Sequence, residues 1–256
     1  MSKICILGNS HLGALAQSEA GAKAFEAAGH DVVYWGAAGT LFPKITYKDG
    51  RLISPAPSRS RIISGGRYGH LDLDDFDTLL VYGGSVPLSN AAARIAARMT
   101  TLAPLSGAFR TAALNEQIAL WWQDRPAGAL MQAMIDAHPE KRYIFTPDPL
   151  MARNDAYLAR ISDPVLLRQV LDAMYMHCQT WCDTRGIGFY RQNEHTLAEG
   201  RLTTHPSFST NSVKMEKGEA HPDEDFVHMN GSYGDVVMAD LLTLVQSPEQ
   251  AVRAAG

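Results

Sequence analysis

Residues 3–13, which read Lys-Ile-Cys-Ile-Leu-Gly-Asn-Ser-His-Leu-Gly, constrain the fold of this chain more than any other stretch. The apolar run 4–7 has the length of a strand buried on both faces, and Gly8 ends it. Small and apolar residues over 12–28 then predict a helix. The N-terminal amides of that helix point back at the turn that holds Ser10 and His11, where they favour an anion or a developing oxyanion.

Two chemistries use this geometry. Residues 8–13 match the dinucleotide-binding pattern G-x-G-x-x-G, except that Ser10 replaces the glycine that lets a pyrophosphate approach. The strand expected over 31–35 also ends in Tyr34-Trp35-Gly36, without an acid to hold a ribose. The other chemistry makes Ser10 a nucleophile at the carboxyl end of a buried strand, and it requires a histidine base elsewhere in the chain.

A candidate for that histidine lies near the other end of the chain. Residues 225–234 read Asp-Phe-Val-His-Met-Asn-Gly-Ser-Tyr-Gly and precede an apolar helix expected over 235–245. The D-x-x-H spacing lets the carboxylate of Asp225 fold back onto the imidazole of His228 and orient it. His195, His205 and His221 are rivals for the base, but none combines an acid at this spacing with a helix directly after it.

With these two blocks the chain resembles the SGNH (GDSL-type) hydrolase family. The first block of this family, just after strand one, is a glycine, then an acid or amide, then the nucleophilic serine. The last block of the family is D-x-x-H, just before the final helix. The resemblance implies a flavodoxin-like, three-layer α/β/α fold around a mainly parallel sheet of roughly five strands. It also implies Ser10 as nucleophile, His228 as general base and Asp225 as its orienting partner, with no cofactor and no metal.

The same resemblance implies an oxyanion hole formed by the backbone amides of Ser10 and Gly36. The third block departs from the family pattern, because Gly83-Gly84-Ser85-Val86 stands where G-x-N-D is usual. The asparagine donor is thus missing, and loss of one such donor typically lowers the rate by ~100- to 1000-fold. We expect either that Ser85 or Asn90 substitutes for it or that the enzyme is slower.

Composition and charge narrow the class of protein. With 256 residues, 46% of them apolar, the chain can bury a full core, and we expect a single α/β domain over 1–256. A net charge of −4 offers no basic field for nucleic acid. Without a long apolar stretch or a cleavage site, we expect a cytoplasmic protein and no membrane partner. Cys178 and Cys182, beside His177, indicate core packing rather than a zinc site, which needs four ligands.

Two irregular segments interrupt the regular elements, of which the first, residues 41–76, either walls the site or is a surface excursion without function. Residues 41–76 form an insertion after the second strand, and alternating runs about Lys48-Asp49-Gly50 predict a β-hairpin within it. Residues 191–222 form a long polar loop, which we expect at the rim of the cleft. The remaining elements are predicted as strands over 78–82, 142–146 and 188–190 and helices over 89–102, 106–123, 126–138 and 164–185.

The function implied by the resemblance is that of a serine esterase or acyl hydrolase, acting through a covalent acyl-enzyme. Its substrate and partner would be a small-molecule O-acyl ester, for example an O-acetylated carbohydrate. The alternatives are an acyltransferase with the same triad, a nucleotide-binding α/β protein that uses residues 8–13, and a catalytically silent binding module. The oligomeric state is not predicted.

Overall fold

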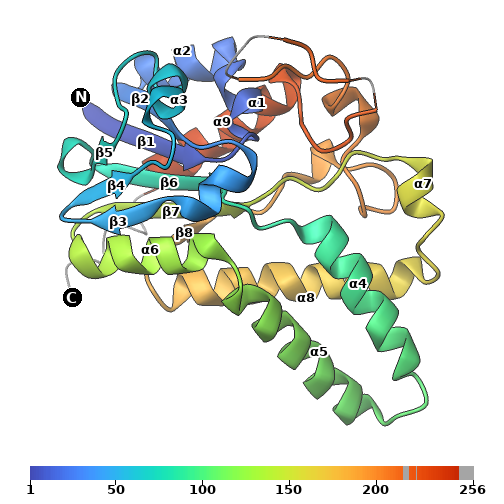
Figure 1. Ribbon diagram of the computed structural model, residues 1–256. Helices are drawn as coiled ribbons and strands as arrows, with labels where there is room; N and C mark the ends of the chain where they lie inside the picture. Colours follow the sequence, from blue (N-terminus) through green and yellow to red (C-terminus); the bar gives the residue numbers. More distant parts are fainter. Residues whose placement is uncertain (216–218, 223, 248–256) are drawn as a thin grey trace.

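The computed structural model describes residues 1–215, 219–222 and 224–247. A five-stranded sheet with the order β2-β1-β6-β7-β8 forms its centre (Figure 1). Its strands are β1 (Ser2–Gly8), β2 (His30–Gly36), β6 (Thr78–Gly83), β7 (Arg142–Pro147) and β8 (Gly188–Phe189). All pairings in this sheet are parallel, with Gly8 opposite Gly36 on one side and Tyr82 on the other. The carboxyl ends of these strands therefore meet at one edge, where parallel sheets carry their sites.

Helices cover both faces of the sheet (Figure 1). One face carries α1 (Leu12–Ala16), α2 (Glu19–Ala27) and α9 (Gly231–Gln246). The other carries α4 (Leu88–Thr101), α5 (Gly107–Gln123), α6 (Pro126–Ala137) and α8 (Pro164–Asp183), and the short α7 (Asp155–Leu158) precedes α8. The expected three-layer α/β/α architecture is confirmed. No helix in the described ranges is both long and apolar enough to cross a membrane.

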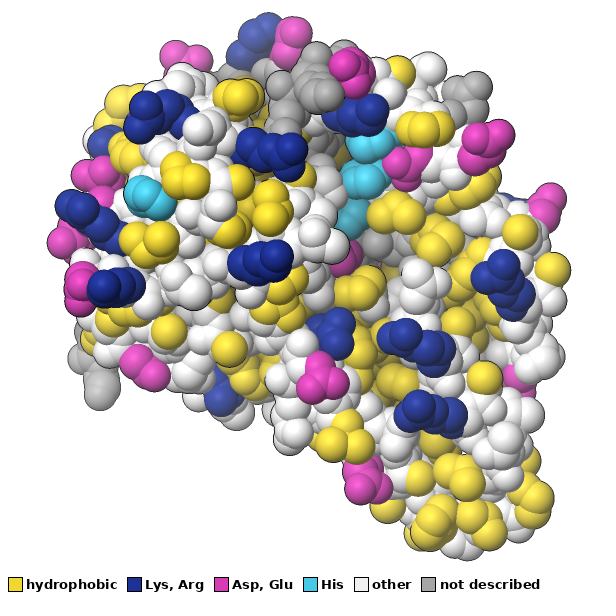
Figure 2. All heavy atoms as spheres, viewed as in Figure 1, with side chains coloured by type: hydrophobic (Ala, Val, Ile, Leu, Met, Phe, Trp, Pro, Cys, Tyr) yellow, Lys and Arg dark blue, Asp and Glu magenta, His cyan; other side chains and the backbone are white. Residues whose placement is uncertain are grey.

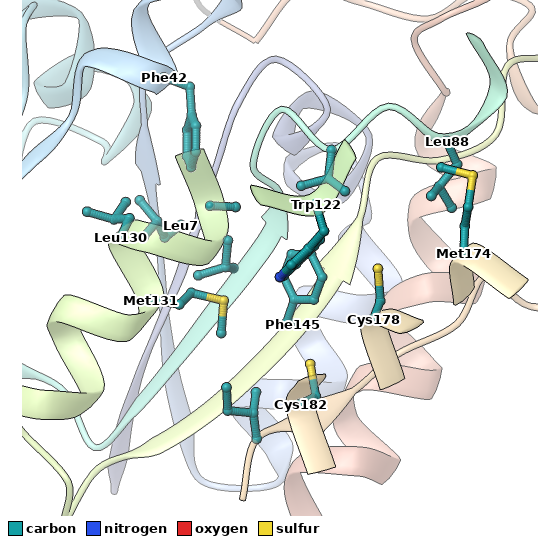
Figure 3. Close-up of a cluster of buried hydrophobic side chains, with 14 of the residues drawn as sticks. Leu7, Phe42, Leu88, Trp122, Leu130, Met131, Phe145, Met174, Cys178 and Cys182 are labelled. Carbon is teal, nitrogen blue, oxygen red and sulfur yellow. The ribbon is translucent and has the colours of Figure 1, made fainter. Parts of the chain in front are cut away.

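Alternate residues of β1 feed two separate hydrophobic clusters, as the two-residue period of a strand requires. Ile4 and Ile6 face the cluster with α1 and α9, whereas Cys5 and Leu7 face the larger cluster on the opposite side. Figure 3 shows part of the larger cluster, in which Cys178 and Cys182 of α8 lie beside Trp122 and Phe145. Both thiols are fully buried, and burial raises the pKa of Cys178 to about 12. Their predicted role in core packing is confirmed.

The insertion after β2 contains the predicted hairpin, formed by β3 (Thr46–Lys48) and β4 (Arg51–Ile53). Asp49 and Gly50 both have positive φ, as a two-residue hairpin turn requires. A third antiparallel strand, β5 (Leu71–Asp72), completes a small second sheet. Between β4 and β5 lies α3 (Pro57–Ile63), a helix that the sequence analysis did not predict. Pro57 begins it, at the position where a missing N–H costs least.

The single helix predicted over 12–28 is wrong, because the chain breaks between α1 and α2. Ser18 Oγ accepts a hydrogen bond from the backbone N–H of Gly21 (3.0 Å) and donates one to Asp235 on α9 (2.6 Å). Serine is among the preferred N-cap residues, and here the cap is also tied to a distant helix. The break thus combines a local serine cap with a tertiary contact to α9 that local sequence does not reveal.

The long segment 191–222 is only partly irregular. It contains the 3₁₀ turns Glu194–Thr196 and Pro206–Phe208 and a bridge between Leu197 and Thr204. Asn230, the N-cap of α9, donates from Nδ2 to the carbonyls of Ser207 and Thr210 and so ties this segment to the helix. Residues 216–218 of the expected rim lie outside the described residues.

α9 packs on α1 at a glycine, which brings the two ends of the fold together. A Cβ on Gly234 would overlap the carbonyl oxygen of Ala14 in α1. Because that obstacle is backbone inside a helix, no side chain can rotate away to admit a methyl group. The distance between α1 and α9 is therefore set by the absence of a side chain at this position.

We predict that Gly234→Ala lowers the free energy of unfolding by about 1 to 3 kcal/mol, the usual effect of overpacking. Urea unfolding measures this value. Gly107→Ala is the matched control, because a Cβ at this first residue of α5 meets nothing within 4 Å. A Gly234→Ala protein as stable as the wild type would contradict the proposed constraint on α1 and α9.

Candidate active site

The turn after β1 and the loop before α9 place Ser10 and His228 in contact. Ser10 Oγ lies 2.8 Å from His228 Nε2, although the two residues are 218 positions apart in the chain. Both side chains are partly buried. In the tautomer with the proton on Nδ1, the ring accepts the Ser10 hydroxyl proton at Nε2, which is the arrangement of a general base and its nucleophile.

Asp225 holds the other side of the His228 ring. Its Oδ2 lies 2.7 Å from His228 Nδ1, and its Oδ1 accepts hydrogen bonds from the backbone N–H groups of Val227 (2.9 Å) and His228 (3.0 Å). Burial alone would raise the pKa of Asp225, but the hydrogen bonds from the His228 ring and from these two amides outweigh it and lower the pKa. A carboxylate in this position favours the tautomer of His228 with the proton on Nδ1 and is suited to stabilise an imidazolium.

A second histidine, which the D-x-x-H pattern does not include, also contacts Asp225. His221 Nδ1 lies 3.0 Å from Asp225 Oδ2, and its ring stacks on that of His228 with 4.1 Å between centroids and 10° between planes. Burial first, and then repulsion from His228, lowers the pKa of His221. The sequence signal was the acid four residues after His221, a spacing that the D-x-x-H criterion excluded. The other two rivals, His195 and His205, are exposed.

These three residues bring donor atoms within 4.8 Å of one another, close enough in principle for a metal ion. The stacking disfavours this use, because an ion in the plane of one imidazole would lie outside the plane of the other. The geometry suits one carboxylate that is hydrogen-bonded to the ring of His228 and also contacts the ring of His221.

A buried carboxylate, Asp148, joins the Ser10 turn to the loop after β6. Its Oδ1 accepts from Asn9 Nδ2 at 3.0 Å, and Asn9 Oδ1 accepts from the backbone N–H of His11 at 3.1 Å. A Cβ on Gly83 would lie 2.6 Å from Asp148 Oδ1, so this position requires glycine. Burial raises the pKa of Asp148 to about 6, although hydrogen bonds from Asn9 and from the backbone of Val86 act in the opposite direction.

His11 lies beside this carboxylate and remains uncharged. Its Nε2 is 3.8 Å from Asp148 Oδ1, and its ring centroid is 5.4 Å from that of His228. Burial first, and then the nearby His228, lowers the pKa of His11 to about 3. His11 Nδ1 is buried without a hydrogen-bond partner among the described residues. Its ring therefore packs against the site as a neutral group.

The other expected oxyanion donors, Gly36, Ser85 and Asn90, do not line the pocket beside Ser10. Gly36 packs against β1 so tightly that a Cβ would overlap the carbonyl oxygen of Gly8, whereas Gly39, three residues farther on, lines the pocket beside Ser10. Ser85 has a positive φ of 61°. Its backbone N–H interacts with the carboxylate of Asp148 as a hydrogen-bond donor, which acts to lower the pKa of that group. Asn90 is exposed in the first turn of α4.

A hollow of about 310 Å³ opens beside Ser10, His221 and His228. Figure 2 shows histidine side chains along a hollow in the upper part of the molecule. The remaining wall is mainly apolar, with Ala38, Ile63 and Met215, and Arg59 and Lys214 also contribute to it. Its volume is that of a hollow that accepts a small-molecule ligand.

No family model matches the chain, and no curated protein matches its sequence. A putative acylhydrolase from Bacteroides fragilis aligns with it at a TM-score of 0.48 and 11% identity, over 96% of this chain and 87% of its own. A GDSL-like lipase from Bacteroides thetaiotaomicron aligns at a TM-score of 0.48 and 11% identity, over 96% of this chain and 88% of its own. Phospholipase A1 from Streptomyces albidoflavus aligns at a TM-score of 0.47 and 13% identity, over 94% of this chain and 98% of its own. At TM-scores below 0.5 these likenesses carry no argument about function. The function proposed below therefore rests on the geometry of the site.

The raised pKa of Asp148 predicts a pH-dependent stability. The folded carboxyl keeps its proton up to about pH 6, whereas the unfolded one releases it near 3.8. Deprotonation therefore favours the unfolded state, and stability through this group falls as the pH rises from about 4 to 6, by on the order of 3 kcal/mol in total. Asp148→Asn, which retains an acceptor for Asn9, removes this loss.

Urea unfolding of the wild type and of Asp148→Asn at pH 4.5 and 7.5 measures the effect. We expect the variant to gain stability relative to the wild type as the pH rises. Asp49→Asn, at the exposed hairpin turn, should follow the wild type and is the control. Parallel behaviour of all three proteins would contradict the raised pKa of Asp148.

Proposed function

We propose that this protein is a serine esterase or acyl hydrolase that acts on small O-acyl esters through a covalent acyl-enzyme. One observation carries the proposal: the continuous hydrogen-bonded series from Ser10 Oγ to His228 Nε2 (2.8 Å) and from His228 Nδ1 to Asp225 Oδ2 (2.7 Å). A nucleophile, a base within reach and a group that orients the base are the recurring signature of acyl transfer.

In the first step His228 Nε2 takes the proton of Ser10 as Oγ attacks the ester carbonyl. The tetrahedral intermediate then collapses, and the imidazolium returns this proton to the departing alkoxide, which leaves an acyl-serine and a free alcohol. In the second step His228 deprotonates water, which attacks the acyl carbonyl, and the imidazolium returns the proton to Ser10 Oγ as the carboxylic acid is released. Asp225 stays ionised throughout and stabilises the imidazolium.

The oxyanion donors we propose are the backbone N–H groups of Ser10 and Gly39. The N–H of Ser10 has no acceptor within the described ranges, and it lies at the amino-terminal side of α1. Gly39 has a φ of 57° and lines the same pocket, so it replaces Gly36 in the role implied by the family resemblance. Two preorganised amides in a partly desolvated pocket are the usual means of stabilising this charge.

We predict that a fluorophosphonate probe labels the wild type and that Ser10→Ala abolishes the labelling. Hydrolysis of p-nitrophenyl acetate should fall by roughly 10⁴-fold or more in Ser10→Ala and His228→Ala. Ser58→Ala, at an exposed serine of α3, is the matched control and should label fully. Equal labelling of Ser10→Ala and the wild type would remove Ser10 from the mechanism, and an unlabelled wild type would favour a silent binding module.

The products and ligands of the same protein separate the remaining alternatives. An acyltransferase with the same triad would transfer the acetyl group to an added alcohol faster than to water. A nucleotide-binding protein would show a higher melting temperature with NAD, which a hydrolase would not. We expect acetate as the main product and no effect of NAD.

We also predict that His221 positions Asp225 without touching the reacting atoms. His221→Ala removes the imidazole that contacts Asp225 Oδ2, and we expect kcat to fall roughly 10-fold, equal to about 1.4 kcal/mol, with little change in KM. His221→Asn supplies an amide N–H close to the place of Nδ1 and should restore most of the activity. Equal impairment of the Ala and Asn variants, or a change confined to KM, would contradict this role.

A further inference from the structure

A second hollow, of about 270 Å³, lies between α4, α5 and the start of α6, apart from the pocket that contains Ser10. Arg94 and Arg98 reach it from successive turns of α4, and Arg125, the N-cap of α6, reaches it from another side. In Figure 2, Lys and Arg side chains continue from the hollow with the histidines toward the projecting helices at the lower right. Three guanidinium groups thus gather in one concavity of a chain whose net charge is −4.

Two of these arginines are fixed by neutral acceptors. Arg98 Nη1 donates to the side-chain carbonyl of Gln117 at 2.6 Å, and Arg125 Nε donates to the backbone carbonyl of Trp121 at 3.0 Å. In the described part of the chain, Arg94 has neither a hydrogen bond nor an ion pair. Neutral acceptors hold a guanidinium in place without cancelling its charge, so Arg98 and Arg125 are preorganised for an anion.

The electrostatics of the hollow favour a negative ligand. The pKa of Arg125 is lowered, first by burial and then by repulsion from Arg94. The carboxylate of Asp124 acts in the opposite direction but does not outweigh them. Asp124 also lines the hollow, so the described lining carries three guanidinium groups and one carboxylate. An anion between the arginines would relieve their mutual repulsion and accept bidentate hydrogen bonds.

Trp121 lies at the same place and can report on binding. It lines the hollow, and its indole Nε1 is buried without a hydrogen-bond partner among the described residues. Because this nitrogen is closed off from solvent, an anion in the hollow does not accept from it directly, but the Arg125 guanidinium lies over the same ring, 5.9 Å from its centroid. This N–H also provides a spectroscopic reporter.

We propose that Arg94, Arg98 and Arg125 form a binding site for an oxyanion, namely a phosphate or carboxylate group. The site is connected to the Ser10 turn: Arg125 interacts electrostatically with Asp148, and Asp148 accepts a hydrogen bond from Asn9, the neighbour of Ser10. The anion belongs either to the ester substrate itself or to a separate small molecule. Binding at this site does not depend on the proposed hydrolase activity.

Titration of the full chain with inorganic phosphate tests the proposal. Calorimetry gives the affinity, and the indole N–H resonance of Trp121, assigned by its loss in Trp121→Phe, reports on the site. We expect this resonance to move on addition of phosphate and the affinity to fall about 10-fold or more in Arg94→Gln/Arg98→Gln. Arg61→Gln, at an exposed arginine of α3 outside the hollow, is the matched control and should bind as the wild type does.

A wild type that does not bind phosphate would overturn the proposal, as would a double variant that binds it unchanged. Circular dichroism of the double variant excludes loss of the fold as the cause of weaker binding. Because no step of this test uses hydrolysis, a failure of the proposed esterase activity would leave its outcome intact.

Kinetics identify the source of the anion once binding is established. If it is part of the substrate, Arg94→Gln/Arg98→Gln raises KM for the p-nitrophenyl monoester of succinic acid but leaves that for p-nitrophenyl acetate unchanged. Phosphate should then compete with the anionic ester. If the anion is a separate molecule, the double variant loses phosphate binding while its KM values for both esters stay equal to those of the wild type.

Discussion

The close contact between α1 and α9 is the constraint on which the arrangement of the site depends. Ser10 stands in a turn and His228 in a loop, so neither side chain is held by a long element of its own. Each is followed within three residues by a helix, α1 beginning at Leu12 and α9 at Gly231. Because Gly234 lets the backbones of these two helices touch, the packing of the helices fixes the distance between the hydroxyl and the imidazole. Ser18, which bonds to Asp235, and Gly21, which packs against Met238, extend this contact along α2.

Most of the sheet and helices could be predicted because their signals are local. Buried parallel strands read as short apolar runs that end at glycine or a polar residue, as β1 and β6 do. α3 was missed because only Ser60 and Ile63 are buried in it, too few to give an apolar period among its Pro, Ser and Arg residues. The break at Ser18 was missed for a different reason, since the hydrogen bond to Asp235 that stabilises it spans 217 positions of sequence.

The residues of the site likewise divide into those that local sequence patterns indicate and those that only the fold reveals. Ser10, Asp225 and His228 belong to short patterns, and the fold brings these three side chains together. Asp148 lies 139 positions from Asn9, and no local pattern indicates that a carboxylate there would organise the Ser10 turn. His221 was passed over because the pattern pairs one imidazole with each carboxylate, whereas here two share Asp225. Gly36 and Gly39 are close in sequence, but only the backbone path after β2 decides which of them reaches the pocket.

The sheet also separates the interior into two compartments, with a consequence for how this protein can change. The helices that follow Ser10 and His228 pack in the smaller compartment with Ile4 and Ile6, while the methionines and cysteines of α6 and α8 fill the larger one. Substitutions in the larger compartment are therefore expected to alter thermal stability while leaving the contact between Ser10 and His228 unchanged. The smaller compartment offers no such freedom, so attempts to evolve or stabilise the protein have most latitude on the α8 side of the sheet.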